Sequence, residues 1–151
     1  VGAADLKRLL QWVFFNLYVG NNDSHAKNLS VLQTPMGGYR LAPFYDLMCT
    51  AIYPGLSRRF AFAIGGERRP GAIAAGHLQG MARELGFAPR YVMAVGQALA
   101  GELPGALQQV QAGLLAQATA AAERTLLERL GRWIRSNARR HAHRWGMAVR
   151  G

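Results

Sequence analysis

The stretch Gly20-Asn21-Asn22-Asp23-Ser24-His25-Ala26-Lys27-Asn28 gathers most of the chemically informative polar residues of this chain. Within it Asp23 is followed five residues later by Asn28, and Asp46 comes eighteen residues after Asn28. The chain has only three aspartates, so two of them belong to this pattern. An Asp-x-x-x-x-Asn pair on one loop, with a second carboxylate downstream, is typical of a phosphoryl-transfer site.

The residue types also fit that chemistry. A carboxylate such as Asp23 can orient an acceptor hydroxyl and accept its proton. Asn28 and Asp46 offer the hard oxygen ligands that Mg²⁺ prefers. A plainer interpretation exists, because Asn and Asp are also common in turns that follow a helix. The order and spacing of the three residues favour the catalytic interpretation.

Helices are predicted on both sides of this loop. Hydrophobic side chains recur at steps of three and four over residues 3–18, which predicts a buried or amphipathic helix that ends at Gly20. Residues 76–149 are predicted to be helical throughout, with breaks at Gly86 to Pro89 and at Leu103-Pro104-Gly105. The expected helices of this bundle span residues 90–102, 106 to about 123, and 125–145.

Strands are predicted between these helical parts. Residues 29–33 and 39–42 flank the turn Thr34-Pro35-Met36-Gly37-Gly38, which indicates a β-hairpin. Residues 60–64 alternate large and small side chains before Gly65-Gly66, which predicts another short strand. The pattern as a whole indicates an α+β fold that is mainly helical.

Composition limits the class of protein. A chain of 151 residues, half of them hydrophobic, is expected to form one globular domain, residues 1–151. Its apolar stretches are too short to cross a bilayer, and its start reads as a cut inside a longer chain rather than as a signal peptide. Cys49 is the only cysteine, so a reducing cytoplasm is the simplest compartment. The net charge of +10 has two interpretations. Either the protein attracts polyanions, or its organism has an arginine-rich proteome.

The loop from Gly20 to Asn28, followed by Leu41-Ala42-Pro43-Phe44-Tyr45-Asp46, resembles the signature of the HipA-like toxin kinases. Phe62-Ala63-Ile64-Gly65-Gly66-Glu67 is similar to a further segment of that family. The resemblance covers residues 3–85 well and the later helices in general character. It implies the fold of a protein-kinase C-lobe, with a catalytic loop, short hairpins and a C-terminal helical bundle.

The resemblance also implies a function. Such proteins are bacterial serine/threonine protein kinases of type II toxin–antitoxin pairs, and they use ATP and Mg²⁺. They phosphorylate a translation factor such as an aminoacyl-tRNA synthetase and thereby promote persistence. By this match Asp23 is the catalytic base, and Asn28 and Asp46 are Mg²⁺ ligands. His25 and Lys27 would lie near the transferred phosphate. The implied antitoxin is a small HipB-like DNA-binding protein.

The sequence departs from ordinary protein kinases in ways that a HipA-like chain would. Asn21-Asn22 replaces the usual His-Arg before the catalytic Asp, and Asp46-Leu47-Met48 replaces Asp-Phe-Gly. No glycine-rich phosphate loop or strand lysine precedes the catalytic loop. We therefore expect the nucleotide-gripping N-terminal lobe to be absent, which leaves the chain inactive alone or one part of a split kinase.

Residues 132–150 form a basic run with six arginines, two histidines and no acidic residue. Arginines interleaved with Trp133 and Trp145 could contact nucleic acid. Alternatively, the arginines face water while Trp133, Ile134, Asn137 and His141 form the inner stripe of a last helix, which we favour. The alternative function is thus a non-catalytic basic helical module that binds nucleic acid or a protein partner. The spacing of His25, Cys49, His141 and His143 matches no zinc pattern.

Overall fold

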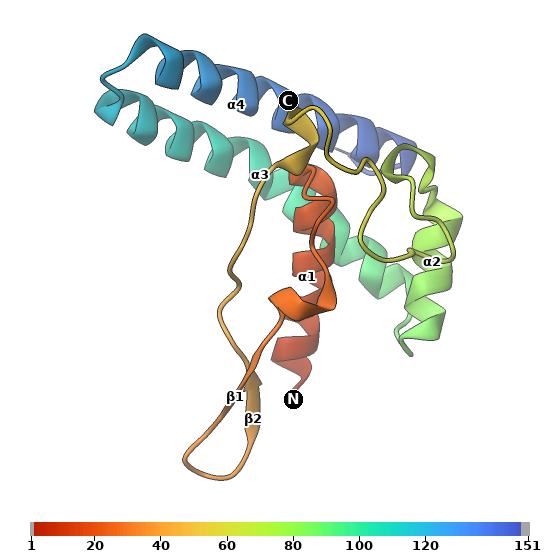
Figure 1. Ribbon diagram of the computed structural model, residues 1–151. Coiled ribbons are helices and arrows are strands. Elements are labelled where there is room, and N and C mark those ends of the chain that lie inside the picture. The colour runs from red at the N-terminus through yellow and green to blue at the C-terminus, as the bar shows by residue number, and fades with distance from the viewer. Residues whose placement is uncertain (1, 149–151) are drawn as a thin grey trace.

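A computed structural model describes residues 2–148. The fold is mainly helical, with four α-helices and one two-stranded sheet in these residues. Figure 1 shows α3 and α4 lying side by side, with α1 crossing them and the hairpin projecting away. The α-helices are α1 (Ala3–Val19), α2 (Ala75–Glu84), α3 (Pro89–Gln117) and α4 (Ala121–Arg144); the strands are β1 (Val31–Gln33) and β2 (Tyr39–Leu41); short 3-10 helices are η1 (Ala26–Asn28), η2 (Thr50–Ile52) and η3 (Pro70–Ala72).

Helix α1 is the central element of the core. Its spaced apolar residues from Leu10 to Leu17 are buried as the periodicity predicts, whereas Leu6 in the first turns is exposed. Helix α3 packs against α1, α2 and α4, and α4 also packs against α1. The side chains that fill this core include Leu10, Phe14, Leu17, Tyr18, Phe60, Ile64, Ile73, Leu78, Val92 and Ile134.

The predicted hairpin is confirmed. β1 and β2 are antiparallel, with Val31 opposite Leu41 and Gln33 opposite Tyr39. Gly37 in the turn has a φ of 81°, a left-handed conformation that glycine adopts without steric cost. Most hairpin side chains are exposed, so burial on a hydrophobic core contributes little to its position.

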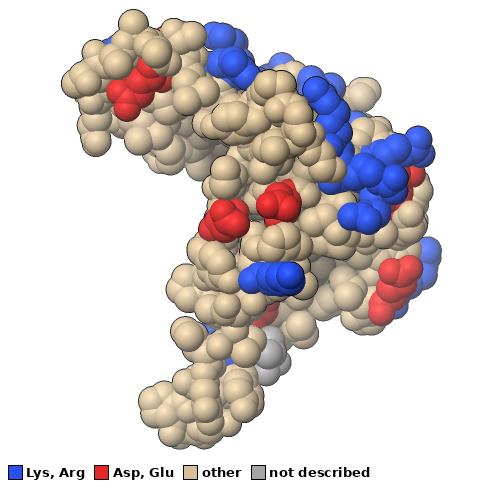
Figure 2. Space-filling model, in the orientation of Figure 1, with Lys and Arg blue, Asp and Glu red and all other residues tan. Residues whose placement is uncertain are grey.

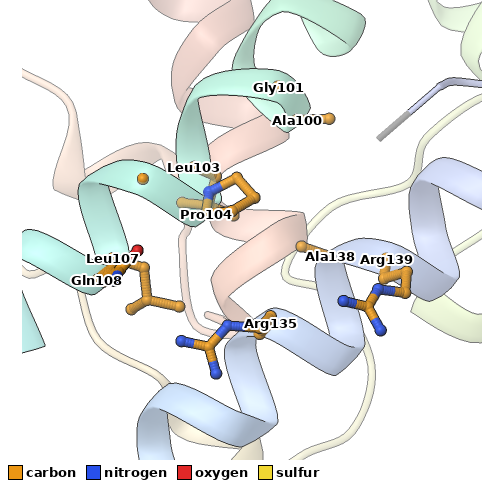
Figure 3. Close-up of a pocket in the computed structure, with 10 residues that line it drawn as sticks. Ala100, Gly101, Leu103, Pro104, Leu107, Gln108, Arg135, Ala138 and Arg139 are labelled. Carbon is orange, nitrogen blue, oxygen red and sulfur yellow. The ribbon is translucent and has the colours of Figure 1, made fainter. Parts of the chain in front are cut away.

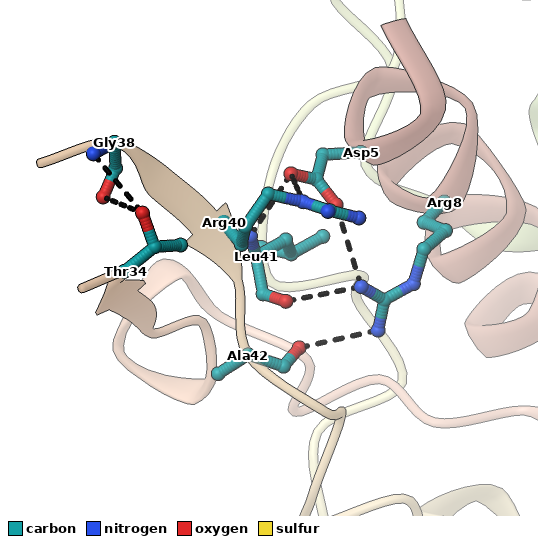
Figure 4. A network of polar contacts seen from close by, with 7 residues as sticks. All are labelled: Asp5, Arg8, Thr34, Gly38, Arg40, Leu41 and Ala42. Carbon is teal, nitrogen blue, oxygen red and sulfur yellow. Dashed lines mark hydrogen bonds and ion pairs between the residues drawn. The ribbon is translucent and has the colours of Figure 1, made fainter. Parts of the chain in front are cut away.

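A buried carboxylate on α1 anchors the hairpin instead (Figure 4). The side chain of Asp5 accepts hydrogen bonds from Arg40 Nε at 3.0 Å and from the backbone N–H of Leu41 at 3.2 Å. Arg8 pairs with Asp5 and also donates to the carbonyl oxygen of Leu41 at 3.0 Å. Burial acts to raise the pKa of Asp5, but these hydrogen bonds and the two arginine charges outweigh it and lower the pKa.

The strand predicted for residues 60–64 is wrong. Within residues 2–148 this segment forms no ladder: it makes an isolated bridge between Ile64 and Glu67, around the turn at Gly65 and Gly66, and a single Phe60 N–H bond to the Arg68 carbonyl at 2.7 Å. The side chain of Arg68 donates to the carbonyl oxygens of Phe60 and Ala61, both at 3.0 Å. In a β-strand, such carbonyl oxygens would instead accept from backbone N–H groups of a neighbouring strand. The alternation of large and small residues therefore reflects burial in coil rather than a ladder.

The predicted helix break at Pro104 is also wrong, because α3 runs continuously through it. Proline removes one helical hydrogen bond and crowds the preceding turn. Tertiary contacts hold both sides of this position: Leu103 is buried, Leu107 packs on the core, and Gln111 Nε2 donates to the Leu127 carbonyl of α4 at 3.0 Å. The break expected between about residue 123 and residue 125 lies slightly earlier, since α3 ends at Gln117 and α4 begins at Ala121.

The inner stripe predicted for the last helix is confirmed. Ile134 and His141 are buried, and Asn137 donates from Nδ2 to the carbonyl oxygens of Leu17 and Tyr18, each at 2.9 Å. The other histidine of the pair, His143, is exposed. Val149 and Arg150 lie outside the described residues. No helix within residues 2–148 is long and apolar enough to cross a membrane.

Candidate active site

The loop begins at a fixed helix end. Gly20 terminates α1 with a φ of 72°, and the N–H groups of Gly20 and Asn21 both reach the Asn16 carbonyl oxygen. The side chain of Asn16 is buried, donates to the Trp12 carbonyl at 2.8 Å and accepts from Asn21 Nδ2 at 2.9 Å. This buried amide pair sets the direction in which the chain leaves α1.

Further hydrogen bonds shape the turn around Asp23. Its N–H donates to Asn21 Oδ1 at 3.3 Å, and Ser24 Oγ donates to the Asn21 carbonyl at 3.2 Å. The buried hydroxyl of Thr50 accepts from the Asn22 N–H at 2.9 Å and donates to the Gly20 carbonyl at 3.2 Å. The side chain of Asp23 is therefore carried on a backbone whose polar groups are largely satisfied.

The structure brings Asn28 and Asp46 together. Asn28 Nδ2 donates to Asp46 Oδ2 at 3.2 Å and to the Asp23 carbonyl at 3.5 Å. Asp46 has a φ of 56°, the one positive φ at a non-glycine position in residues 2–148, and such conformations concentrate at functional sites. Its own carbonyl accepts from Asn21 Nδ2 at 3.3 Å, so both ends of the residue contact the loop.

The segment that delivers Asp46 is held at two points. Arg8 contacts the carbonyl oxygens of Leu41 and Ala42 at its start (Figure 4). At its end Tyr45 donates its hydroxyl hydrogen to the carbonyl oxygen of Lys27 at 2.9 Å. The hairpin thus returns the chain to the loop from which it departed.

Asp23 borders a small open cavity of about 180 Å³ that Asn22, Thr50, Leu56 and Ser57 also line. Its carboxylate is exposed and makes no hydrogen bond or ion pair within residues 2–148. A carboxylate that is accessible and unpaired can accept a proton from a hydroxyl placed in such a cavity.

His25 and Lys27 take different positions. The His25 side chain lines an apolar cavity of about 460 Å³ between α1, α2 and residues 61–63, and its Nδ1 is buried without a hydrogen-bond partner in the described residues. Lys27 is exposed on η1. The structure records no contact of either side chain with the carboxylates of Asp23 or Asp46 within residues 2–148.

The donor chemistry of Asn28 and Asp46 fits Mg²⁺. This ion is commonly held by one or two carboxylates together with phosphate oxygens and water, rather than by an all-protein cage. Residues 2–148 hold no cluster of three or more His, Cys, Asp or Glu side chains, the set that a closed protein site would use. Asp46 supplies one exposed carboxylate, and the Asn28 amide oxygen becomes available if the amide rotates.

Four supporting residues were not predicted from the sequence as parts of the site: Asn16, Thr50, Asp5 and Arg8. An asparagine in an apolar helix, as at position 16, is a signal of a buried polar contact. Asp5 and Arg8 stand at i and i+3 on one helix face, but nothing in the sequence pairs them with Arg40. Thr50 carries no such signal.

The fold is thus a mainly helical domain in which Asn28 of the loop contacts Asp46 of the segment after the hairpin, beside the backbone of Asp23. The family model described as "HipA-like C-terminal domain" matches residues 1–107. This match covers well over half of the chain, so the chain belongs to the HipA-like C-terminal domain family. The resemblance seen in the sequence is thereby confirmed.

Two similar proteins agree with this family. The "Putative kinase Y4mE" of Sinorhizobium fredii is 42% identical over 84 residues, which are 56% of this chain and 20% of that protein. The serine/threonine-protein kinase toxin HipA of Shewanella oneidensis is 34% identical over 102 residues, 68% of this chain and 23% of that protein.

A solved structure shows the same fold. It is the complex of HipA, HipB and operator DNA from Shewanella oneidensis MR-1; one chain of it matches with a TM-score of 0.83 and 28% identity, over 91% of this chain and 32% of that chain. The present chain therefore spans between a fifth and a third of the length of these relatives.

Proposed function

We propose that this chain supplies the catalytic base and the metal ligands of an ATP- and Mg²⁺-dependent serine/threonine protein kinase. The observation that carries the proposal is the contact between Asn28 and Asp46 beside the Asp23 backbone, since it unites three residues in the order that phosphoryl transfer requires. A kinase toxin among the relatives supports the reaction class.

Each residue has a separate role in this proposal. Asp23, exposed at its cavity, orients the acceptor hydroxyl and accepts its proton. Asn28 and Asp46 bind the metal, which when present neutralises charge on the transferred phosphoryl group. Lys27, one residue from Asn28, contributes positive charge toward the nucleotide phosphates. His25 supports the loop from the apolar side, and its contribution to transfer would be indirect.

The whole protein is proposed to work as a toxin kinase. The chain is one domain, residues 1–151, that requires a nucleotide-gripping lobe from elsewhere for activity. Its substrate would be a protein, with a translation factor such as an aminoacyl-tRNA synthetase as the leading class. A HipB-like DNA-binding antitoxin would be its partner, as HipB accompanies HipA in the matching complex. The compartment implied by this role is the cytoplasm.

Phosphoryl transfer to a generic acceptor protein tests the proposal, measured with this chain complemented by the N-terminal lobe of a HipA-like kinase. Asp23→Asn should lower the rate about 100-fold or more, the scale of general-base catalysis. Glu128→Gln, which alters an exposed carboxylate on α4 away from the loop, is the control and should retain the rate. An Asp23→Asn protein with unchanged rate would refute the role of Asp23.

Nucleic-acid contact is a second candidate function. Figure 2 shows Lys and Arg side chains gathered along the side of α4 and the neighbouring coil. Exposed arginines of α4 include Arg132, Arg139 and Arg140, and Arg58 and Arg59 are exposed in the coil between η2 and η3. If they contact DNA, binding should weaken steeply with salt because counterions are released. A gel-shift comparison after changing Arg135, Arg139, Arg140 and Arg144 to Ala tests this. Unchanged binding would mean that these arginines only face solvent.

A further inference from the structure

Three residues inside α3 are poorly suited to a helix. Gly101, Pro104 and Gly105 lie in its middle, although glycine and proline are the least favourable residues of a helix interior. Proline also leaves the carbonyl of Ala100 without its usual helical donor. Packing explains why the helix survives, but it does not explain why these residues stand there.

The same three residues line a cavity of about 330 Å³ between α3 and α4 (Figure 3). Gly101 and Gly105 are exposed at the cavity wall, and a Cβ atom at either would meet no heavy atom within 4 Å, so a larger side chain can be added there without a clash. Leu103 and Leu107 contribute apolar surface to the wall. The α3 side of the cavity is therefore apolar at Leu103, Pro104 and Leu107.

Two arginines complete the cavity wall from the other side. Arg135 and Arg139 stand four residues apart on α4, and Figure 3 shows both side chains extending toward the space beside Pro104 and Leu107. Within residues 2–148 neither makes an ion pair or a side-chain hydrogen bond, whereas Arg129 donates to the Ile52 carbonyl and Arg144 to that of Pro70. Like charges at this spacing repel, so an anion between them would be favourable.

We propose that this cavity binds a small organic carboxylate with an apolar body. The guanidinium groups of Arg135 and Arg139 present forked donors that match a carboxylate. The apolar wall would cover the rest of the molecule, and the volume lies at the lower end of the range for small-molecule sites. The site is separate from the Asn28–Asp46 pair, and the proposal does not depend on kinase activity.

Binding of 4-phenylbutyrate to the 151-residue chain tests the site, by calorimetry and by shifts of the Gly101 and Gly105 amide signals in NMR spectra. We expect saturable binding with a Kd of about a millimolar or below. Arg139→Gln should weaken it about 10-fold or more, because a charge-assisted bond is lost. Gly101→Leu should abolish it by filling the cavity.

Matched controls come from the same helices. Arg132→Gln removes an exposed arginine of α4 that does not line the cavity, and Gly113→Leu adds a side chain to α3 where a Cβ also meets nothing within 4 Å. Both variants should bind as the parent does. Circular dichroism establishes whether each variant is folded. If Gly101→Leu does not fold, the comparison of Arg139→Gln with Arg132→Gln tests the proposal by itself.

Three outcomes would overturn the proposal. Equal affinity for 4-phenylbutanol, which has the same apolar body without the carboxylate, would mean that the arginines do not select the ligand. Equal affinity for inorganic phosphate would indicate a general basic surface of the kind that nucleic acid uses. Absence of binding up to about 10 mM, far weaker than small-molecule sites of this kind, would mean that the hollow is unoccupied.

Discussion

The indole ring of Trp133 occupies the space beside Gly20 where any other residue would place its Cβ atom. Gly20 also has a φ of 72°, so both the backbone and the packing require glycine. Gly20→Ala should lower the free energy of unfolding by about 2–4 kcal/mol, combining left-handed strain with overpacking. Urea denaturation monitored by circular dichroism measures this change.

A control separates strain from packing at this position. Gly86 follows α2 with a φ of 75°, and a Cβ there meets no atom within 4 Å. Gly86→Ala should therefore cost only about 1 kcal/mol. In a Trp133→Leu background the cost of Gly20→Ala should fall to a similar value, since the ring is gone. Equal costs for Gly20→Ala with and without the ring would contradict the packing explanation.

His141 predicts a pH dependence of stability. It is buried against the rings of Tyr18 and Trp145, and its Nδ1 lies 2.9 Å from Arg144 NH1. Burial, followed by the charges of Arg144 and Arg140, lowers the pKa of His141 to about 3. The folded state thus resists protonation, whereas the unfolded chain takes up a proton near pH 6.5. Stability should fall as the pH drops from about 6.5 toward 3, by up to about 1.4 kcal/mol per pH unit.

Aspartate and glutamate side chains also titrate in the lower part of this pH range. A variant that lacks His141 therefore separates the contribution of the histidine from theirs. His141→Gln should show a shallower loss of unfolding free energy between about pH 6.5 and about 4.5. His143→Gln, two residues away and exposed, should keep the slope of the parent chain. Parallel curves for all three proteins would mean that His141 is not the group responsible.

Local patterns predicted much of the fold, and tertiary contacts account for what they missed. The helix ending at Gly20 and the turn at Gly37 follow from backbone chemistry that each residue carries by itself. The continuity of α3 through Pro104 depends on contacts with α4, which no local rule contains. Spacing likewise suggested that Asn28 and Asp46 cooperate, but their meeting requires the hairpin to return to the loop.

The return of the hairpin should depend on Asp5. Asp5→Asn removes the charge that faces Arg8 and Arg40 and weakens the acceptor for the Leu41 N–H. Hydrogen exchange of the Leu41 amide should become about 10-fold faster or more, because hydrogen bonds to a charged group are the stronger ones. Since the pKa of Asp5 is lowered, the parent chain should keep this protection at neutral pH and lose it only as the pH falls below about 4.

An ion pair away from the hairpin provides the comparison. Glu67 pairs with Arg69 at 3.0 Å away from the hairpin, so Glu67→Gln should leave the exchange rate of the Leu41 amide unchanged. If Asp5→Asn also leaves it unchanged, the ion-pair network does not hold the hairpin on α1.

The proposed division of labour between Asp46 and Asp23 makes the sharpest prediction about the site. Asp46→Asn removes the anionic metal ligand, so it should weaken Mg·ATP binding as well as turnover in the lobe-complemented protein. Asp23→Asn removes the proposed proton acceptor, which has no assigned role as a metal ligand, so it should lower turnover while Mg·ATP binding stays nearly intact. Raised Mg²⁺ should then partly restore Asp46→Asn, because mass action refills a weakened metal site, but it cannot replace a base. Titration of phosphoryl transfer against Mg²⁺ for both variants measures this difference. Equal rescue of the two would show that the roles are wrongly assigned, and full activity of both would remove the kinase proposal itself.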